Sequence, residues 1–355
     1  MILTCACVIK MRNKLTALML LTYTPLTLHL RNPFRLSYGT SETRQVFWIR
    51  LAEDEGWGEA AIPPYYGVDP SAMTACWDRA ARTAHPLPER IEDIPAWVGL
   101  EGPAPARCAL DLALHDRIGR KLGLPLYRLL GLPKPPPLST CFTIAIDTPA
   151  EMARMAQEAA RFPAIKVKLG GQGDDEERIA AIRAARPDAR LRLDANAGWS
   201  FDEARAYLRK LEPYDLELVE QPLAKDQIKA MGRLQQETAI PLVADESLQS
   251  LADIESLARA GVRGVNLKLM KLGGLANGLA CLRRANELGL RIMLGCMIET
   301  SIGTTAMAHL AGLAEWIDLD SPMLIDNDPF EGLTYDEQGR IQVPERAGIG
   351  IRREA

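Results

Sequence analysis

The chain has 355 residues, of which 47% are hydrophobic and 25% are charged, with a formal net charge of -4. This length predicts one large α/β unit with a smaller companion. The slightly acidic balance excludes the broad basic surface of a protein that binds nucleic acid or anionic lipid. We therefore expect a small-molecule substrate and a homo-oligomer of the chain, with no nucleic acid and no membrane as partners.

The first 22 residues hold a short apolar run, Leu15–Leu21, preceded by basic residues. The run is too short to span a bilayer. No convincing small-residue cleavage site follows it, so we interpret residues 1–22 as an extension of uncertain status rather than a signal peptide. The seven cysteines form no C-x-x-C pair and their number is odd, which argues against a disulfide framework. These features predict a cytoplasmic protein.

Residues 23–132 predict an α+β unit. Three strand-like segments, LTYTPLTLHL, QVFWIRL and GWGEAAI, indicate an antiparallel meander, with turns expected at Asn32-Pro33 and Glu53–Glu55. Helical periodicity follows and is clearest in CALDLALHDRIGRKLG, which Gly123 ends. The proline-rich segment Pro133–Leu138 marks the boundary to the next unit.

Residues 133–325 alternate short apolar strands with amphipathic helices, the pattern of repeated βα units. Eight units predict a closed (β/α)8 barrel, in which catalytic groups lie where strands end. An open doubly wound sheet is the alternative, but the chain has no glycine-rich phosphate motif to support it. Residues 326–355 add a final strand that is expected to return to the first unit. The predicted barrel strands end near Ile146, Leu169, Asp194, Glu220, Asp245, Lys268, Leu294 and Asp320.

Three successive strands of this barrel end in an acidic residue: Asp194, Glu220 and Asp245. These carboxylates would meet at one rim, where unpaired anions repel each other and resist burial. A divalent cation would compensate them, and three carboxylates with water suit Mg²⁺. Each residue taken singly could instead cap a helix or form a salt bridge. Asn196 and Glu246 would orient these ligands.

Lysines flank this acidic trio on both sides. Lys166 and Lys168 are two residues apart in AIKVKLGG and point to the same side of a strand, and Lys268 lies in the strand of NLKLMKLGG. Buried lysines are unfavourable unless they are paired or used; surface lysines on an edge strand, the alternative, do not suit a closed barrel. On the second and sixth of eight strands, Lys168 and Lys268 would face each other. Such a pair could remove a proton from one face of an α-carbon and return one to the other, while Lys166 and the metal stabilise the enolate.

The motifs K-x-K at Lys166, D-x-N at Asp194, E-Q-P at Glu220, D-E at Asp245 and NLKLMKLGG occur together in this chain. Together they resemble the muconate-lactonizing-enzyme subgroup of the enolase superfamily, over nearly the whole chain from about Tyr23. The resemblance implies an amino-terminal α+β capping domain, residues 23–132, on a (β/α)8 barrel. It also implies one Mg²⁺ per subunit, held by Asp194, Glu220 and Asp245, with Lys168 and Lys268 as the acid/base pair. Members of the subgroup catalyse cycloisomerisation, o-succinylbenzoate synthesis, N-acyl amino acid racemisation or dipeptide epimerisation, so these motifs alone do not name the reaction.

The segment WIDLDSP at the eighth strand discriminates among these reactions. Its Asp318 and Asp320 resemble the D-x-D motif of dipeptide epimerases, in which two carboxylates hold the free α-ammonium of the substrate. CMIETSIG, which contains Ile298 and Glu299, is also similar to dipeptide epimerases and would line the same pocket. The resemblance implies an isomerase that inverts the α-carbon of the C-terminal residue of an L,L-dipeptide. The alternatives are a D-x-D that only caps the next helix, an o-succinylbenzoate synthase or another lactonising or racemising member, and a barrel without catalysis.

Two capping-domain loops, residues 32–44 and 60–67, are expected to select the dipeptide. Ala-Glu epimerases place an arginine in the first loop, and the matching position here is Gly39, which leaves Arg35 as the candidate for an acidic side chain. Relatives that bind cationic dipeptides carry an extra acid where this chain has Ile298. With Tyr65, Tyr66 and Ile298 as an apolar wall, we expect a small or hydrophobic dipeptide, and an acidic one stays open.

Overall fold

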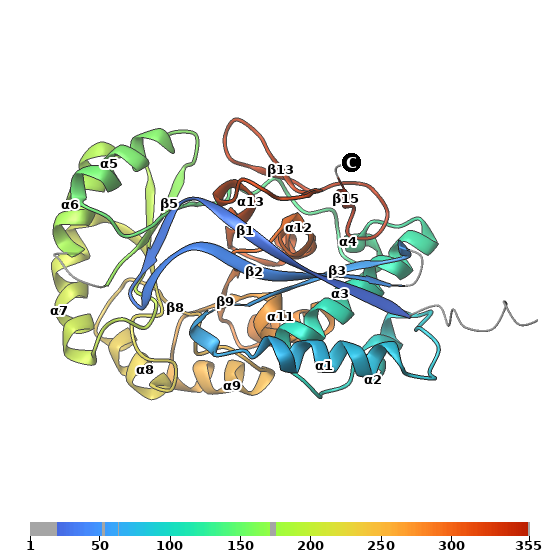
Figure 1. The fold of residues 1–355 in the computed structure, drawn as a ribbon. Helices are drawn as coiled ribbons and strands as arrows, with labels where there is room; N and C mark the ends of the chain where they lie inside the picture. Colours follow the sequence, from blue (N-terminus) through green and yellow to red (C-terminus); the bar gives the residue numbers. More distant parts are fainter. Residues whose placement is uncertain (1–19, 52–53, 63, 171–174, 354–355) are drawn as a thin grey trace, which may run out of the picture.

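The computed structural model describes residues 20–51, 54–62, 64–170 and 175–353. The predicted extension and its apolar run lie almost entirely outside these residues. Within them, no helix combines the length and the apolar character needed to cross a membrane. Figure 1 shows two long strands, β1 and β2, that run across the front of a ring of strands and helices.

An antiparallel sheet opens the described chain, in the order β1 (Leu21–Leu36), β2 (Gly39–Leu51) and β3 (Trp57–Ala61). The predicted meander is therefore confirmed. The turn predicted at Asn32-Pro33 is wrong, because β1 continues through it with a register shift between His29 and Phe34. Proline has no N–H to donate, and an irregular point in a strand tolerates this loss. The turn predicted at Glu53–Glu55 lies partly outside the described residues.

Helices pack against this sheet and complete the unit that we call the cap, which comprises β1–β3 and the helices before β4. α3 ends at Gly123, whose φ of 67° is left-handed, as the sequence predicts. Trp77, Leu110 and Leu114 are buried between the sheet and these helices. The bounds are η2 Pro64–Tyr66, α1 Pro70–Ala81, η3 Ile91–Asp93, α2 Ile94–Val98, α3 Ala104–Leu122 and α4 Leu126–Leu129.

Eight parallel strands follow, and neighbours along the chain are neighbours in the sheet. Each ends within two residues of its predicted end. The first and last strands meet, because Cys141 N donates to Ile317 O (3.4 Å) and Leu319 N donates to the Thr140 hydroxyl (2.9 Å). The sheet is a nearly closed barrel, so the predicted (β/α)8 fold is confirmed. The strands are β4 Phe142–Ile144, β5 Ala164–Lys168, β6 Arg190–Asp194, β7 Leu216–Glu220, β8 Leu242–Ala244, β9 Gly264–Leu267, β10 Arg291–Gly295 and β11 Trp316–Asp318.

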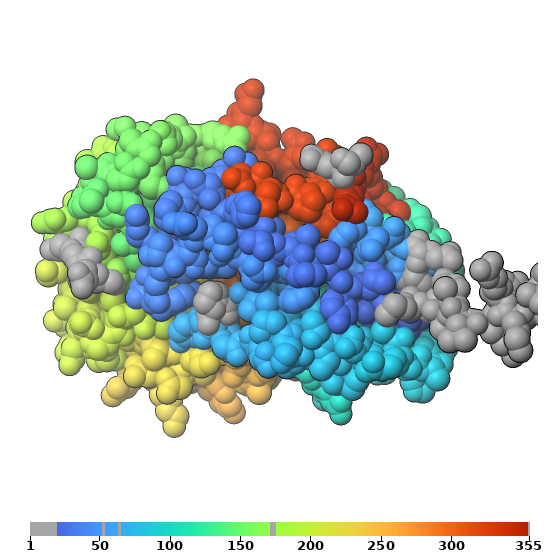
Figure 2. Space-filling model, in the orientation of Figure 1, coloured from blue at the N-terminus to red at the C-terminus, as the bar shows by residue number. Residues whose placement is uncertain are grey.

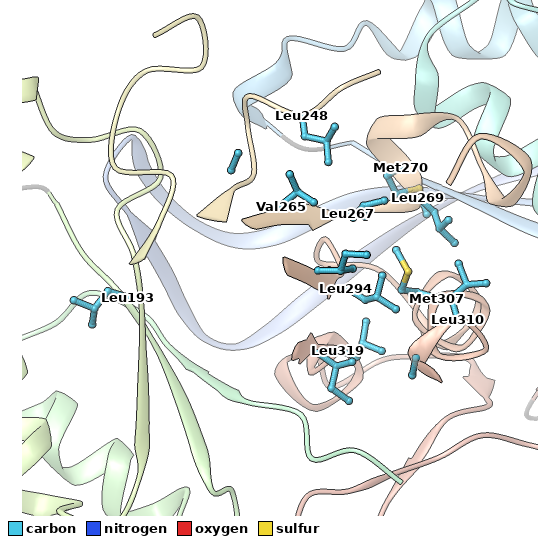
Figure 3. Close-up of a cluster of buried hydrophobic side chains, with 14 of the residues drawn as sticks. Leu193, Leu248, Val265, Leu267, Leu269, Met270, Leu294, Met307, Leu310 and Leu319 are labelled. Atoms are coloured by element: carbon cyan, nitrogen blue, oxygen red, sulfur yellow. The ribbon is translucent and has the colours of Figure 1, made fainter. Parts of the chain in front are cut away.

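Helices between the strands cover the outside of the barrel. In α7, for example, Ser200 and Glu203 form a capping box at the start, and Ala204, Leu208 and Leu211 make the buried face. Figure 3 shows part of the core, where Leu294 of β10 lies with Met307 and Leu310. The bounds are α5 Pro149–Glu158, α6 Asp175–Ala185, α7 Phe201–Leu211, η4 Glu212–Tyr214, α8 Ile228–Gln236, α9 Leu251–Ala260, α10 Leu269–Leu272, α11 Leu275–Glu287, α12 Ser301–Ala308, η5 Ala311–Leu313 and α13 Ser321–Leu324.

Two buried carboxylates fix the cap to the barrel. Asp111 of α3 accepts a hydrogen bond from Leu275 N at the start of α11, and Gly274 beside it has a φ of 116° and no room for a Cβ. Glu59 of β3 accepts hydrogen bonds from Thr300 N (2.8 Å) and Gly303 N (3.0 Å) at the start of α12. Such N–H groups have no partner inside their own helix. Both contacts hold the cap at the carboxyl ends of the barrel strands, where α11 and α12 begin.

The last segment pairs β12 (Phe330–Glu331) with β15 (Arg352–Arg353) and β13 (Thr334–Tyr335) with β14 (Ile341–Gln342). Phe330 packs edge-on against Trp48 of β2, with ring centroids 5.1 Å apart. Ile349 N donates to Asp116 Oδ1 of α3 (2.8 Å). The segment therefore contacts the cap, while the domain boundaries drawn from the sequence stay predictions.

His309, just after α12, joins three parts of the chain. Its Nδ1 accepts a hydrogen bond from Tyr127 N of the cap (3.3 Å), so its Nε2 carries the proton and donates to Ile349 O (3.0 Å). Burial disfavours the charged ring and lowers the pKa of His309 from 6.5 to about 4. The neutral ring is therefore part of the joint between the barrel, the cap and the last segment.

We expect His309 to make the protein less stable as the pH falls from about 6.5 to about 4. Over this range the folded state keeps the ring neutral while the unfolded chain takes up a proton, a difference of about 3 kcal/mol at most. Urea titrations across the range should show a shallower loss for His309→Gln than for the wild type. The same change at the exposed His29 is the control, and equal slopes in the wild type and His309→Gln would contradict this role.

Candidate active site

A cavity lies between the cap and the carboxyl ends of the barrel strands. It has about 690 Å³ of open space including its mouth, a size that suits a small molecule. Figure 2 shows the strands of the cap, in blue, lying across this face of the molecule. The lining includes Lys166, Lys168, Asn196, Asp245, Glu246, Lys268, Ile298, Asp318 and Asp320 from the barrel, and Phe34, Tyr38, Arg44 and Tyr66 from the cap.

Lys166 is the centre of a first charged cluster. Its Nζ lies 2.9 Å from Asp194 Oδ2, 2.7 Å from Glu220 Oε2 and 2.8 Å from Asp318 Oδ2. Lys168 Nζ lies 2.6 Å from the same oxygen of Asp194. These side chains come from β5, β6, β7 and β11, so one ammonium joins the ends of four strands.

Asp245 is the centre of a second cluster, just after β8. Lys268 Nζ lies 2.8 Å from Asp245 Oδ2, and Lys271 binds both Oδ1 and the main-chain oxygen of Asp245. Asn266 connects the two clusters, because its main-chain oxygen accepts from Lys271 (3.0 Å) and its Nδ2 donates to Glu220 Oε1 (2.8 Å). The lysine and acid positions are therefore set together.

Lys168 and Lys268 line the same cavity from distant strands. Lys168 ends β5, the second strand of the barrel, and Lys268 follows β9, the sixth, with β6–β8 between them. Both side chains are largely buried. The two ammonium groups therefore reach the cavity from the two sides of β6–β8, the arc of strands that ends in the three acidic residues.

The sequence suggested that the three acidic strand ends are unpaired, but in the structure they are paired. Each has a lysine at ion-pair distance. In the part of the chain that the structure describes, no three Asp, Glu, His or Cys side chains are grouped so as to hold a metal ion. The ammonium groups lie among the carboxylates instead, so charge burial alone does not require a cation.

The oxygen atoms nevertheless suit Mg²⁺ in kind. Asp194, Glu220 and Asp245 are almost fully buried. Beside them, Asn196 Oδ1 and Glu246 Oε2 are buried and accept no hydrogen bond from the described residues. Asn196 N donates to Asp194 Oδ1 (2.9 Å), and Asn196 Nδ2 donates to Glu246 Oε1 (3.1 Å). Carboxylate oxygens are the ligands that Mg²⁺ prefers, so this set fits the ion.

The backbone at these strand ends is locally strained. Asn196 and Gln221, which follow two of the acidic residues, have left-handed φ values of 43° and 34°. Such conformations of residues other than glycine are unfavourable by about 1–3 kcal/mol and persist where surrounding contacts determine them. Gln221 shows such contacts: its Oε1 accepts from Asp245 N (2.9 Å) and Ser247 N (3.1 Å). The glutamine of E-Q-P therefore ties the end of β7 to the end of β8.

The site holds more buried carboxyl groups than amines. Burial, reinforced by a neighbouring carboxylate in each case, raises the pKa of Glu220 to about 7, of Glu246 to about 8 and of Asp320 to about 7. A further positive charge in the cavity would favour the ionised forms. The buried groups are the carboxyls of Asp194, Glu220, Asp245, Glu246, Asp318 and Asp320 and the amines of Lys166, Lys168, Lys268 and Lys271.

Asp318 and Asp320 lie on the opposite part of the rim from the β6–β8 arc. Asp318 Oδ1 accepts from the thiol of Cys141 (3.2 Å), and Asp320 Oδ2 accepts from Thr143 N (2.7 Å). Asp320 precedes α13, but its side chain makes no capping hydrogen bond to that helix. The alternative that this D-x-D merely caps the next helix is therefore wrong for Asp320.

Known proteins share this fold. Residues 149–354 match the family described as enolase C-terminal domain-like. An L-Ala-D/L-Glu epimerase from Bacteroides thetaiotaomicron is 34% identical over 94% of this chain and 88% of its own. A dipeptide epimerase from Cytophaga hutchinsonii, solved in complex with Mg and the dipeptide D-Ala-L-Val, has a TM-score of 0.87 at 31% identity and covers 95% of this chain and 96% of its own. The chain belongs to the dipeptide epimerase family of the enolase superfamily. It is therefore an isomerase.

Membership of this family does not select the dipeptide. A hydrophobic dipeptide epimerase from Roseobacter litoralis is 35% identical over 90% of this chain and 95% of its own, nearly the same identity as the Ala-Glu relative. The two relatives are named for different substrates, although their sequence identities to this chain are nearly the same. The residues that select the dipeptide have to be found in the cavity itself.

Only some of the residues that the sequence predicts to select the dipeptide line the cavity. Tyr66 and Ile298 line the cavity, whereas Tyr65 does not line it and packs against Tyr66 with ring centroids 5.4 Å apart. Gly39 is exposed at the start of β2, outside the lining. Glu299 is buried behind the lining, next to Glu59 and Gly303.

Arg35, which the sequence suggested as the residue that binds an acidic side chain, lies away from the cavity. Its guanidinium forms an ion pair with Asp147, and it lies outside the cavity lining. Arg44 and Tyr38, which sequence reasoning missed, do line the cavity. The alternation of buried and exposed residues along β2 could have identified Arg44, because Arg44 shares a buried face with Val46 and Trp48.

We expect Lys166→Met to destabilise the metal-free protein by about 3–5 kcal/mol, because three buried carboxylates lose the cation they share. Urea unfolding in EDTA measures this loss. If Mg²⁺ binds the same carboxylates, adding it should recover part of the loss. Lys229→Met, at an exposed position, is the control, and equal stability of the two variants would contradict the central place of Lys166.

Proposed function

We propose that the chain is a two-base, Mg²⁺-dependent dipeptide epimerase that inverts the α-carbon of the C-terminal residue of an L,L-dipeptide. The observation that carries the proposal is that Lys168 and Lys268 line one cavity from the second and sixth strands of the barrel. An α-carbon held between them would lose its proton to one amine and receive a proton from the other. Inversion requires that the two amines lie on opposite faces of the α-carbon. Two amines on the same face could only exchange its proton.

The acidic strand ends suit the carboxylate end of the substrate. Asp194, Glu220 and Asp245 would hold one Mg²⁺, with Asn196 and Glu246 keeping their orientation through the hydrogen bonds described above. When bound, the ion would withdraw electrons from the substrate carboxylate and so make the α-hydrogen more acidic. Lys166, buried beside Asp194 and Glu220, adds a fixed positive charge where negative charge develops on that carboxylate.

Asp318 and Asp320 suit the other end of the dipeptide, its free α-ammonium. Both line the cavity across from the acidic arc. The pKa of Asp320 is raised to about 7 by burial and by Asp318, which indicates that this pair lacks a full counter-charge. A substrate ammonium would supply it, whereas a dicarboxylate substrate would be repelled. This favours a dipeptide over the substrate of an o-succinylbenzoate synthase.

The direct experiment is incubation of the protein with Mg²⁺ and a library of L,L-dipeptides in D₂O. Epimerisation with solvent hydrogen adds one deuterium at the inverted α-carbon, which mass spectrometry detects and digestion with a stereospecific peptidase locates. Incorporation into at least one dipeptide is expected. No incorporation into any dipeptide would contradict the proposal, and turnover of a dicarboxylate would then favour an o-succinylbenzoate synthase.

We expect Lys168→Ala and Lys268→Ala each to abolish epimerisation. The remaining lysine can still exchange the α-hydrogen on its own face, so each variant should exchange deuterium into one stereoisomer only, and the two variants into opposite ones. Proton NMR of separate L,L and L,D dipeptides in D₂O measures this. Full epimerisation by either variant would rule out the two-base scheme, and Lys229→Ala is the control.

We expect Mg²⁺ to raise the thermal midpoint of the EDTA-treated protein, because binding to the folded state alone adds stability. At a concentration about a hundredfold above Kd the gain is about 2.7 kcal/mol. Glu220→Gln should lose most of the shift. Glu217→Gln changes an acid on the same strand that binds Arg192 instead, and it should keep the shift. Equal shifts in the two variants would remove Glu220 from the ligand set.

A further inference from the structure

Arg44 occupies a position in β2 where the strand pattern calls for an apolar residue. Burial alternates along β2, with Arg44, Val46 and Trp48 on the buried face and Thr43 and Gln45 exposed. Arg44 is only 9% exposed. A buried guanidinium is strongly unfavourable unless an anion or several hydrogen bonds compensate it.

The described residues do not supply that anion. Of the cations that line the cavity, Lys166, Lys168 and Lys268 all have carboxylate partners. Arg44 forms no ion pair within the described ranges, and its Nη1 donates only to the neighbouring main-chain oxygen of Thr43 (3.2 Å). Its positive charge is therefore free to meet a ligand.

A second polar group of the cap is also without a partner in this cavity. The hydroxyl of Tyr66 is buried and makes no hydrogen bond to any described residue. Arg44, Tyr66 and Tyr38 all line the cavity from the cap. A hydroxyl without a hydrogen-bond partner and a guanidinium without an ion-pair partner, both lining one cavity, are donors from which a carboxylate accepts hydrogen bonds.

The geometry of the reaction indicates which part of a substrate reaches this wall. Under the proposed function, the hydrogen of the α-carbon lies on the axis between Lys168 and Lys268. The carboxylate points to the acidic strand ends and the amide to Asp318 and Asp320, all on the barrel side. The remaining substituent, the side chain of the inverted residue, has to point to the mouth, which Phe34, Tyr38, Arg44 and Tyr66 of the cap cover.

We propose that Arg44, with the hydroxyl of Tyr66, binds a carboxylate on the side chain of the inverted residue, so that the preferred substrates are dipeptides with a C-terminal glutamate or aspartate. This inference rests on the proposed function and names its substrate class. It differs from the small or hydrophobic dipeptide that the sequence favoured. That expectation rested on Gly39 and on an apolar wall that includes Tyr66 and Ile298. Tyr66 and Ile298 do line the cavity, but Gly39 lies outside the lining, and Arg44, which has no ion-pair partner among the described residues, is five residues further along the chain. A wholly apolar side chain would leave both donors buried without an acceptor.

The first test compares two substrates of nearly equal shape on the wild-type enzyme, L-Ala-L-Glu and L-Ala-L-Gln, with Mg²⁺ in D₂O. The charge difference should give the glutamate at least about tenfold higher kcat/KM. Equal values, or a preference for L-Ala-L-Gln or L-Ala-L-Leu, would overturn the inference. This comparison needs no variant and so does not depend on whether a variant folds.

The second test replaces the guanidinium. Arg44→Met should lower kcat/KM for L-Ala-L-Glu by about 30-fold or more, mainly through KM, and should leave L-Ala-L-Leu unchanged or improved. Tyr66→Phe should weaken L-Ala-L-Glu by several-fold in the same direction. Arg35→Met is the matched control, because Arg35 lies on the same hairpin but is paired with Asp147 outside the cavity, and it should leave both substrates within about twofold.

The outcomes separate this inference from the proposed function. If the wild type incorporates deuterium into no dipeptide, the proposed function fails and the inference fails with it. If dipeptides are epimerised but Arg44→Met affects L-Ala-L-Glu and L-Ala-L-Leu equally, only the inference fails. A change confined to the acidic substrate supports both.

Discussion

The ion pairs at the carboxyl ends of the barrel strands are the constraint on which the site depends. Lys166 holds its ammonium among Asp194, Glu220 and Asp318, which come from strands on different sides of the ring. A buried ammonium is stable only with such partners, and the carboxylates are stable only with it. The same contacts fix the position of the Lys168 ammonium, because Lys168 and Lys166 both bind Asp194. The positions of the buried lysines and acids therefore follow from how the barrel neutralises its own buried charge.

Among the described residues, those of the cap take no part in the ion-pair network of the rim. Asp111 and Glu59 attach the cap to the starts of α11 and α12, two helices that follow β9 and β10. The attachment points therefore lie next to the strand that leads to Lys268. A cap held this way lies over the cavity that both lysines line, and under the proposed function it would limit the access of water to the place where the proton moves. Under the proposed function, the barrel supplies the reacting groups and the cap faces the variable part of the substrate.

Much of the fold was predictable because local patterns determine it. Apolar strands that end in Asp194 and Glu220, and a helix that stops at Gly123, are signals contained in one segment of sequence. The turn predicted at Pro33 was wrong because a proline can also lie at an irregular point of a strand, which depends on the pairing with β2. The pairing of lysines with the acidic strand ends was also missed. Those contacts join residues up to 152 positions apart, such as Lys166 and Asp318, and no local pattern reports them.

In the candidate site, too, features set by local sequence were predictable and features set by distant contacts were not. Residue types at strand ends predicted several side chains that line the cavity, such as Lys168 and Asp320, whereas Asp194 and Glu220 are buried outside the lining and pair with Lys166. The cap residues were harder, since a hairpin residue faces the cavity or the solvent according to strand register. Arg35 and Arg44 lie on the same hairpin, yet one binds Asp147 outside and the other faces the cavity. A shift of one residue in register reverses such an assignment, so loop residues matched by alignment alone are weak guides to specificity.

These two halves of the cavity differ in how freely their residues can change. A substitution at Lys166 or Asp194 leaves a buried charge without its partner and disturbs every strand end that shares it. A substitution at Arg44 removes a charge that pairs with none of the described residues, so its main effect falls on the ligand. Changes of substrate should therefore accumulate in the cap while the barrel stays constant. Relatives of nearly equal identity to this chain carry the names of different dipeptide substrates, so overall identity does not track the substrate.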